Sequence, residues 1–461
     1  MRIKLQIPFK ISEILSALDI QAFEKRNEVV EFITTDTREC EAHDLFIALQ
    51  GEKRSGADYV PEAIKKGAYV VASVKDENVF YTDDTRLSLL KLARAYKKKL
   101  VNLKYTVGVT GSVGKSTTKE FLREILSEKY AVHATEGNYN NHIGVALTVL
   151  TADKNTEVLI LEMGMNSIGE IAELSSYTNP DVAIITNVGT AHIGRLGSRE
   201  NIAKAKLEIL LGMTVGSNLI IPQDEPLLSV DGAYRVALGT ADADLNLSVI
   251  SETPEKTEAK LFTKDRSFCI SVNLCGVHLM KNLSLAIAAG ISLKMSDADI
   301  INGVFKISSD NVRQKVVNHG KFLILDDSYN SSKEAVFAAI DTLIKQQCKI
   351  RSCLFSDMLE LGEYSAVLHF DIGKYAAQCG VKKLYAFGEY SAYVKAGALA
   401  FGIPESCMVI QSEDESLSDF VARIYYKTEE DEIILAKASH ATKMGTVLKM
   451  LMERCKEENA R

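Results

Sequence analysis

The chain has 461 residues, with 54 Lys and Arg against 61 Asp and Glu, and a formal net charge of −7. This length exceeds what one hydrophobic core usually organises and predicts about three domains. The mildly acidic balance, without a basic block, argues against nucleic-acid binding, and no apolar run approaches a membrane span or a secretory signal. We therefore expect a soluble cytoplasmic protein with no membrane insertion.

Apolar, β-rich runs alternate with helical patterns along the chain. The predicted strands span residues 69–74, 105–110, 157–163, 182–188, 322–325, 354–355, 384–387 and 433–436. This alternation is typical of the α/β fold class with parallel sheets. Between residues 217 and 277, shorter runs with polar turns predict a small extra antiparallel sheet.

Two changes in composition divide the chain. One is the charged stretch Lys97-Lys98-Lys99, and the other lies at residues 308–318, before a new strand begins. We therefore expect domains over residues 1–100, 101–315 and 316–461.

A glycine loop follows the strand predicted at 105–110 and precedes a helical pattern at 120–126. The backbone N–H groups of such a loop, together with the N-terminus of the helix, bind phosphate oxygens. Lys115 adds positive charge, and the hydroxyl of Ser116 can hold Mg²⁺. Val109 stands where the full Walker pattern has its first glycine, so the motif is shortened. The residues expected to bind ATP or GTP are Gly111, Ser112, Val113, Gly114, Lys115, Ser116 and Thr117.

Two later strands end in polar side chains. Glu162 lies at the end of the strand predicted at 157–163, and the next strand leads into His192. The carboxyl ends of parallel strands form the ligand-binding edge of a sheet, where Glu162 would hold Mg²⁺. From the residues alone, a solvent-exposed glutamate and a structural histidine remain alternatives.

Taken in order, these motifs and several others resemble the Mur ligase family over essentially the whole chain. The resemblance implies a three-domain Mur ligase architecture with a central P-loop ATPase domain and a C-terminal Rossmann-like domain. The segments that carry it are residues 111–118, 137–144, 162–164, 186–192, 202–209, 276–278 with Asn282, 326–330 and 357–362.

The resemblance implies an ATP-dependent amide ligase that phosphorylates a carboxylate and lets an amine attack the acyl phosphate. The motifs are most similar to those of the member that joins D-alanyl-D-alanine to a UDP-muramoyl tripeptide for peptidoglycan synthesis. ATP, two Mg²⁺ ions and a monomeric state are the corresponding expectations. A paralogous Mur-type ligase with another amino acid or peptide, and a non-catalytic nucleotide-binding regulator, remain alternatives.

The family match also assigns roles at the reacting centre. It implies that Lys115, His192 and Lys206 are catalytic, and that Ser116, Glu162, His192 and Lys206 hold the metal ions. The lysine at the position of Lys206 is carbamylated by CO₂ in the family, which converts a cation into an anionic metal ligand. By pattern alone, Lys206 is a solvated helix lysine like Lys204.

Other matched positions imply contacts with the two larger substrates. Further nucleotide-binding residues are Asn282, Arg313, Asp327, Tyr329 and Asn330, and substrate-binding residues are Thr35, Thr37, Arg38, Asn138 and Asn141. The chain departs from the family pattern at Ser55-Gly56-Ala57 and at Lys437-Ala438-Ser439-His440, where recognition of the substrates would change. The sequence leaves open whether the third residue of the acceptor peptide is lysine or diaminopimelate.

Overall fold

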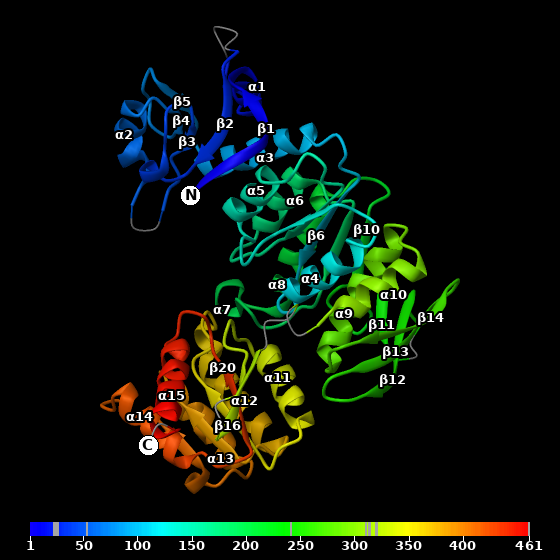
Figure 1. Ribbon diagram of the computed structural model, residues 1–461, viewed down its shortest axis with the longest axis vertical. Helices are drawn as coiled ribbons and strands as arrows, with labels where there is room; N and C mark the ends of the chain where they lie inside the picture. The colour runs from blue at the N-terminus through cyan, green and yellow to red at the C-terminus, as the bar shows by residue number, and fades with distance from the viewer. Residues whose placement is uncertain are drawn as a thin grey trace.

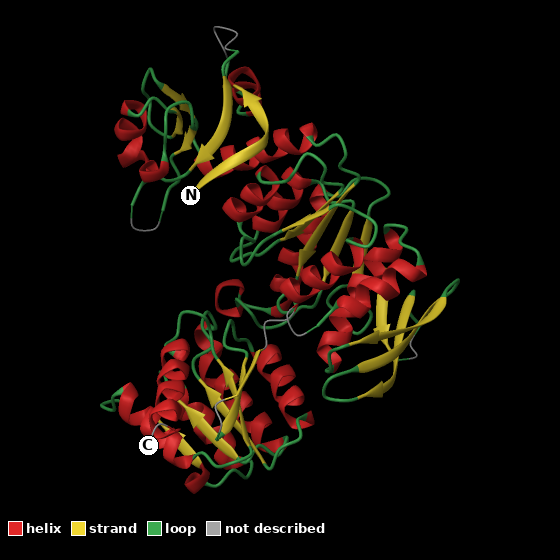
Figure 2. Ribbon diagram, viewed as in Figure 1, coloured by secondary structure: helices red, strands yellow, loops and turns green. Residues whose placement is uncertain are grey.

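A computed structural model describes residues 1–21, 27–51, 54–239, 242–308, 311, 315–318 and 321–459. These residues form three β-sheets, each built from one part of the chain. The three units follow one another along the long axis of the molecule, with the N-terminus in the first and the C-terminus in the last (Figure 1). Every sheet is accompanied by helices, as the secondary-structure colouring of Figure 2 shows. The α/β class predicted from the alternation of runs is therefore confirmed.

The N-terminal unit is a sheet with the strand order β1-β2-β3-β4-β5, in which the β1–β2 pair is antiparallel and the rest are parallel. Helix α3 packs against helices α5 and α6 of the next unit. The elements are β1 (Arg2–Lys10), α1 (Ile11–Ala17), β2 (Val29–Thr34), η1 (Thr37–Glu39), β3 (Leu45–Ile47), η2 (Gly56–Tyr59), α2 (Val60–Lys65), β4 (Tyr69–Ala72), β5 (Val79–Tyr81) and α3 (Thr85–Lys99).

The central sheet has the order β14-β13-β12-β11-β10-β9-β6-β8-β7. Its strands are β6 (Tyr105–Thr110), β7 (Val132–Ala134), β8 (Val158–Glu162), β9 (Val182–Ile185), β10 (Asn218–Pro222), β11 (Tyr234–Leu238), β12 (Leu245–Glu252), β13 (Thr257–Thr263) and β14 (Ser267–Val272). Its helical segments are α4 (Lys115–Leu126), α5 (His142–Leu150), α6 (Glu170–Thr178), α7 (Ile193–Leu196), α8 (Arg199–Leu207), η3 (Glu208–Gly212), α9 (Val277–Ser292) and α10 (Asp297–Lys306).

The expectation of a separate small antiparallel sheet was wrong. Strands β10, β11 and β12 continue the main sheet in parallel, and only β13 and β14 are antiparallel additions at its edge. Apolar residues of these strands, such as Val236 and Leu261, share one hydrophobic cluster with Leu283 of α9. Pairing with the main sheet both protects an exposed strand edge and extends this core.

Strand β8 shows why the central sheet has helices on both faces. Leu159 and Leu161 belong to one hydrophobic cluster, whereas Val158 and Ile160 belong to another. Successive side chains of a strand point to opposite faces, so a continuous apolar run is buried on both sides. Helices α4, α9 and α10 share the second cluster, and α5 and α6 share the first.

The C-terminal sheet has the order β15-β16-β20-β17-β18-β19, with only the β15–β16 pair antiparallel. Its elements are β15 (Lys315–Asn318), β16 (Phe322–Asp326), α11 (Lys333–Lys345), β17 (Ile350–Phe355), η5 (Gly362–Tyr364), α12 (Ser365–Gln378), β18 (Lys383–Ala386), α13 (Ser391–Ala400), η6 (Glu405–Cys407), β19 (Met408–Ile410), α14 (Leu417–Lys427), β20 (Glu432–Lys437) and α15 (Met444–Asn459). The four strands predicted here are present.

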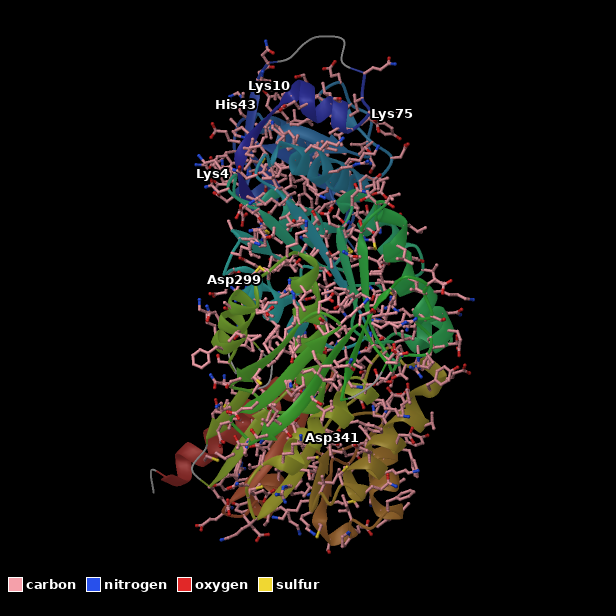
Figure 3. All side chains as sticks on the ribbon, turned by 90° about the vertical axis from the view of Figure 1, so that its right-hand side faces the viewer. Lys4, Lys10, His43, Lys75, Asp299 and Asp341 are labelled. Atoms are coloured by element: carbon pink, nitrogen blue, oxygen red, sulfur yellow. The ribbon has the colours of Figure 1, made fainter. Side chains whose placement is uncertain are left out.

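The side view shows which elements lie at the two ends of the molecule. Lys4 and Lys10 of β1 lie at one end, whereas Asp341 of α11 lies toward the other (Figure 3). Among the described residues, none of the helices is both long enough and apolar enough to cross a lipid bilayer.

Candidate active site

A cavity of about 410 Å³ lies between the central and C-terminal units. Strands β6, β8 and β9 of the central sheet and strands β16 and β20 of the C-terminal sheet end close to it, so the carboxyl edges of two sheets meet there. The candidates that line it are Gly111, Ser112, Val113, Gly114, Lys115, Ser116, Thr117, Asn138, Asn141, Glu162, His192, Lys206, Asn282, Asp327, Tyr329 and Asn330.

The phosphate loop needs its two glycines for both conformation and space. Gly111 and Gly114 have φ values of +147° and +86°. A Cβ on Gly111 would lie 1.8 Å from Oγ1 of Thr186, and one on Gly114 would lie 2.5 Å from Oδ1 of Asn282. Helix α4 begins at Lys115 without a side-chain cap, so its first N–H groups are available to an anion. The ammonium of Lys115 donates to the carbonyl of Gly111 at 2.8 Å.

Thr186 and Asn187 hold the loop from the end of the neighbouring strand. The hydroxyl of Thr186 donates to the carbonyl of Val113 at 2.6 Å. The amide group of Asn187 donates to the same carbonyl at 3.0 Å and accepts from the N–H of Val113 at 3.0 Å. Strand β9 ends at Ile185, three residues before the predicted end, because these residues turn toward the loop. The sequence placed them at this edge but did not predict the contacts.

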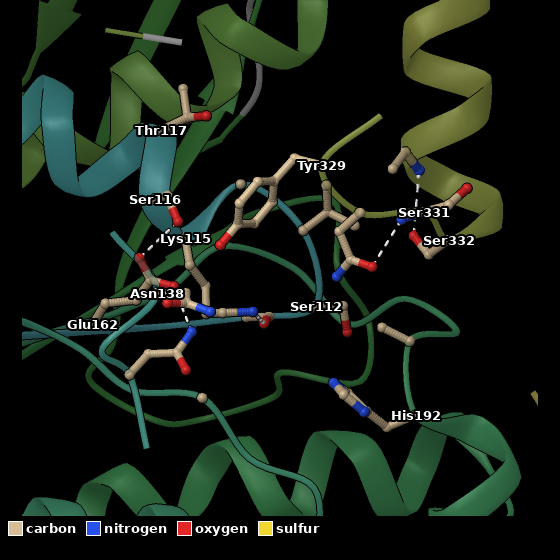
Figure 4. A pocket seen from close by; sticks show the side chains of 18 of the residues that line it. Ser112, Lys115, Ser116, Thr117, Asn138, Glu162, His192, Tyr329, Ser331 and Ser332 are labelled. Carbon is tan, nitrogen blue, oxygen red and sulfur yellow. Dashed lines mark hydrogen bonds between the residues drawn. The ribbon is translucent and has the colours of Figure 1, made fainter. Parts of the chain in front are cut away.

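Ser116 and Glu162 form the part of the site that fits Mg²⁺. The hydroxyl of Ser116 donates to Oε2 of Glu162 at 2.7 Å, and Nδ2 of Asn140 donates to Oε1 at 2.8 Å (Figure 4). Glu162 is buried, so its carboxylate does not belong to the solvent-exposed class left open by the sequence. A hydroxyl and a carboxylate are the oxygen ligands that proteins usually contribute to Mg²⁺ beside a nucleotide. Within the described ranges, no group of three or more His, Cys, Asp or Glu side chains is placed to bind a metal.

Lys206 is buried in the wall of the cavity, whereas Lys204 on the same helix is exposed. The solvated position expected from the pattern alone was therefore wrong for Lys206. Among the described residues, its ammonium has no hydrogen-bonded or ion-pair partner. Burial, with a further contribution from the positive charge of Lys115, lowers the pKa of Lys206 well below its usual value.

His192 lines the cavity just before α7, where its backbone has a φ of +65°. Its Nδ1 contacts Oε2 of Glu360, which comes from the loop after β17 in the C-terminal unit. Burial lowers the pKa of the imidazole, and the Glu360 carboxylate opposes this effect. Residues 357–362 are among the segments that resemble the family, but no role of Glu360 was predicted from the sequence.

The C-terminal wall contains Asp327, Tyr329 and Asn330 at the end of β16. The buried ammonium of Lys437 lies 3.2 Å from Oδ2 of Asp327 and donates to the carbonyls of Asp327, at 2.9 Å, and Asn330. The rings of Tyr329 and His440 lie 5.5 Å apart. Figure 4 shows Tyr329 entering the pocket that contains Lys115 and Ser116. Arg313 lies outside the described residues.

The candidates for the other substrate are divided between two places. Asn138 and Asn141 line the cavity, and the side chain of Asn141 caps α5 by accepting from the N–H of Gly144 at 2.9 Å. Thr35, Thr37 and Arg38 lie elsewhere, after β2 in the N-terminal unit.

The N-terminal candidates are already engaged with neighbouring side chains. The hydroxyl of Thr37 donates to Glu62 at 3.2 Å. The Arg38 guanidinium donates to both oxygens of Asp36, at 2.9 and 2.5 Å, and holds the pKa of that carboxyl well below its usual range.

Comparison with known proteins agrees with this geometry. The Mur ligase middle domain matches residues 109–290, and the Mur ligase family, catalytic domain, matches residues 29–130. The chain is 35% identical over 438 residues to the UDP-N-acetylmuramoyl-tripeptide–D-alanyl-D-alanine ligase of Bacillus subtilis, which covers 92% of this chain and 94% of the relative.

Two solved structures share the fold over nearly the full length. Crystal structure I of MurF from Acinetobacter baumannii superposes with a TM-score of 0.87 at 27% identity, covering 98% of this chain and 100% of that one. MurF from Thermotoga maritima in complex with ADP gives a TM-score of 0.79 at 27% identity, covering 92% and 98%. With its sequence, its three sheets and its phosphate loop in agreement, the chain belongs to the Mur ligase family.

Proposed function

We propose that this protein is the ATP-dependent ligase that joins D-alanyl-D-alanine to a UDP-N-acetylmuramoyl tripeptide in peptidoglycan precursor synthesis. Relatives with this name match it over most of their length, at 35% and 31% identity for those of Bacillus subtilis and a Synechocystis species. The observation that carries the proposal is one cavity that combines a phosphate loop, a Ser116–Glu162 pair and a buried lysine. A protein that only binds a nucleotide has no need of a buried lysine in its cavity.

The central unit supplies the groups for phosphoryl transfer. The first N–H groups of α4 and the ammonium of Lys115 hold the β- and γ-phosphates, and Ser116 with Glu162 contributes ligands to a first Mg²⁺. When bound, Mg²⁺ neutralises the repulsion between the phosphates and the attacking carboxylate of the acceptor. The resulting acyl phosphate is attacked by the amine of D-alanyl-D-alanine. The complex of the Thermotoga maritima relative with ADP supports nucleotide binding by this chain.

Lys206 suits carbamylation because of where it lies. A lysine must be neutral to attack CO₂, and burial beside Lys115 favours the neutral amine. The amine nitrogen would bond to the carbon of CO₂ as one C–O π bond breaks, and it would release a proton to water, which leaves an anionic carbamate. We assign this carbamate, together with His192, to a second Mg²⁺ on the acceptor side.

The remaining walls would hold the larger substrate groups. Asn282 from the central unit and Asp327, Tyr329 and Asn330 from the C-terminal unit face the base and ribose, with Arg313 assigned to the phosphates on domain closure. Asn138 and Asn141 face the muramoyl peptide, whereas Thr35, Thr37 and Arg38 face the UDP end. A cytoplasmic location, a monomeric state and domain boundaries at residues 100 and 315 stay predictions.

The test measures phosphate release from ATP with UDP-muramoyl tripeptide, with and without D-alanyl-D-alanine. The tripeptide is supplied in its lysine and diaminopimelate forms. Release that needs both the tripeptide and the dipeptide supports the proposal, and the better tripeptide identifies the third residue. Release that needs another amine indicates a paralogous ligase, which is the outcome that the departure from the family pattern at residues 437–440 would favour. No stimulation by any acceptor contradicts ligase activity.

A further inference from the structure

The segment from Thr190 to Gly197 is one region where the C-terminal unit contacts the central unit next to the cavity. Glu334 of α11 accepts from the N–H and the hydroxyl of Thr190, both at 3.0 Å. The hydroxyl of Tyr364 in η5 donates to the carbonyl of Gly197 at 2.9 Å. His192 lies between these two contacts, so its surroundings depend on both units.

The backbones of the two units touch beside His192. The N–H of Gly194 donates to the carbonyl of Glu360 at 3.1 Å, and a Cβ on Gly194 would lie 2.5 Å from the nitrogen of Gly362. His192 and Glu360 both have a φ of +65°, a conformation that non-glycine residues rarely adopt. Such strain is retained only where the surrounding structure enforces it, and here it brings two side chains together across a domain junction.

The hydrogen bond between these side chains has a defined donor and acceptor. Nδ1 of His192 contacts Oε2 of Glu360, and the other carboxylate oxygen lies 3.4 Å from Nη2 of Arg195. A carboxylate accepts hydrogen bonds, so Nδ1 carries a proton and the lone pair of a neutral ring is on Nε2. Nε2 has no partner among the described residues, and the ring lines the cavity.

We propose that Glu360 is a positioning residue for His192: it sets the tautomer and orientation of the ring so that the basic Nε2 faces the acceptor side of the cavity. The inference rests on the proposed ligase function and extends it, because Glu360 belongs to the C-terminal unit. Docking of that unit therefore prepares a central-domain side chain for its task. Partners of this kind, which bind the far nitrogen of a functional histidine, typically change activity 10- to 100-fold when removed.

The first test determines which nitrogen of the His192 ring carries the proton, without substrates or metal. Protein carrying ¹⁵N-labelled histidine is studied by NMR at one fixed pH, and the His192 signals are assigned by their loss in His192→Asn. We expect Nδ1–H in the wild type and a mixture of tautomers in Glu360→Gln, because a glutamine amide can accept from Nδ1 or donate to it. Glu334→Ala and Tyr364→Phe remove neighbouring domain contacts at Thr190 and Gly197 and should leave the tautomer unchanged. An unchanged tautomer in Glu360→Gln would overturn the proposal.

The second test separates positioning from simple domain docking. Glu360→Gln should lower kcat for ligation about 10- to 100-fold and change KM for ATP less than about 2-fold, whereas Tyr364→Phe should change kcat less than about 2-fold. In a His192→Asn background, Glu360→Gln should have no further effect, because the two residues act as one unit. Additive losses in the double variant contradict the proposal. If the wild type does not ligate, the proposed function fails, while the tautomer measurement still decides the role of Glu360.

Discussion

Replacing Lys206 by methionine should lower the ligation activity but raise the free energy of unfolding. Methionine keeps an unbranched side chain of similar size but removes the amine. The wild-type side chain is 2% exposed, and its ammonium has no partner among the described residues. The same substitution at Lys204, which is exposed on the same helix, is the matched control.

The size of the effect follows from the cost of burying a polar group without a partner. This cost is about 1–3 kcal/mol, so Lys206→Met should raise the free energy of unfolding by about this amount. For a domain of about 150–250 residues, each kcal/mol corresponds to about 2–4 °C in Tm. Ligation should fall about 10²- to 10³-fold or more, because methionine cannot form the anionic carbamate that we propose for Lys206.

The measurement is thermal unfolding in CO₂-depleted buffer, where the wild-type lysine is not carbamylated, together with phosphate release under ligation conditions. A ¹³C-bicarbonate NMR experiment should show a carbamate signal in the wild type and in Lys204→Met but not in Lys206→Met. Added bicarbonate should not restore ligation to Lys206→Met. Wild-type ligation by this variant would refute the role of Lys206, and a lower Tm would refute the idea that its amine is buried at a cost.

Three further substitutions test other parts of the site. Glu162→Gln should lower kcat about 10²- to 10³-fold and raise the Mg²⁺ concentration required, as measured by phosphate release at varied Mg²⁺; an unchanged Mg²⁺ dependence would exclude Glu162 as a ligand. Gly111→Ala should lower the free energy of unfolding by about 1–3 kcal/mol and abolish ADP binding in calorimetric titration. Gly216 also has a positive φ, of +91°, but a Cβ there would meet no other atom, so Gly216→Ala should retain ADP binding. Burial lowers the pKa of His278 to about 4, so the folded protein binds its proton more weakly than the unfolded chain. The free energy of unfolding should therefore be intact above pH ~6.5 and fall by up to about 3 kcal/mol as the pH drops to about 4, and His278→Gln should remove this slope in denaturant titrations.

Residues that lie within a few positions of a predicted strand end were correctly placed at the edge of the sheet that borders the cavity. The loop from Gly111 to Thr117 was recognised because its glycines, lysine and hydroxyl lie next to a predicted strand and helix. Glu162 was recognised because a strand of uninterrupted apolar residues delivers its last side chain to the edge of the sheet. Strand β6 was predicted to the residue, since both of its ends are marked by a change from apolar to turn-forming residues.

Contacts between distant segments were not recovered. Asn187 holds the backbone of Val113 across 74 positions of the chain, and the Glu360–His192 pair spans 168. No local pattern marks such pairs, because each depends on the packing of separate elements or whole domains. The same limit explains the small antiparallel sheet that was expected and is absent among the described residues: strand periodicity indicates that a strand exists but not which neighbour it joins.

Lys204 and Lys206 show what the sequence can predict and what only the tertiary structure determines. By itself, the sequence indicated the family, eight of the strands, the glycine loop after β6 and the strand ends that line the cavity, because these are properties of short segments. It placed two lysines among alanines, two positions apart on one helix and therefore on different faces. Only the tertiary structure decided which face is buried beside Lys115 and which meets water, because burial is a property of the elements that pack around a residue and not of the residue itself.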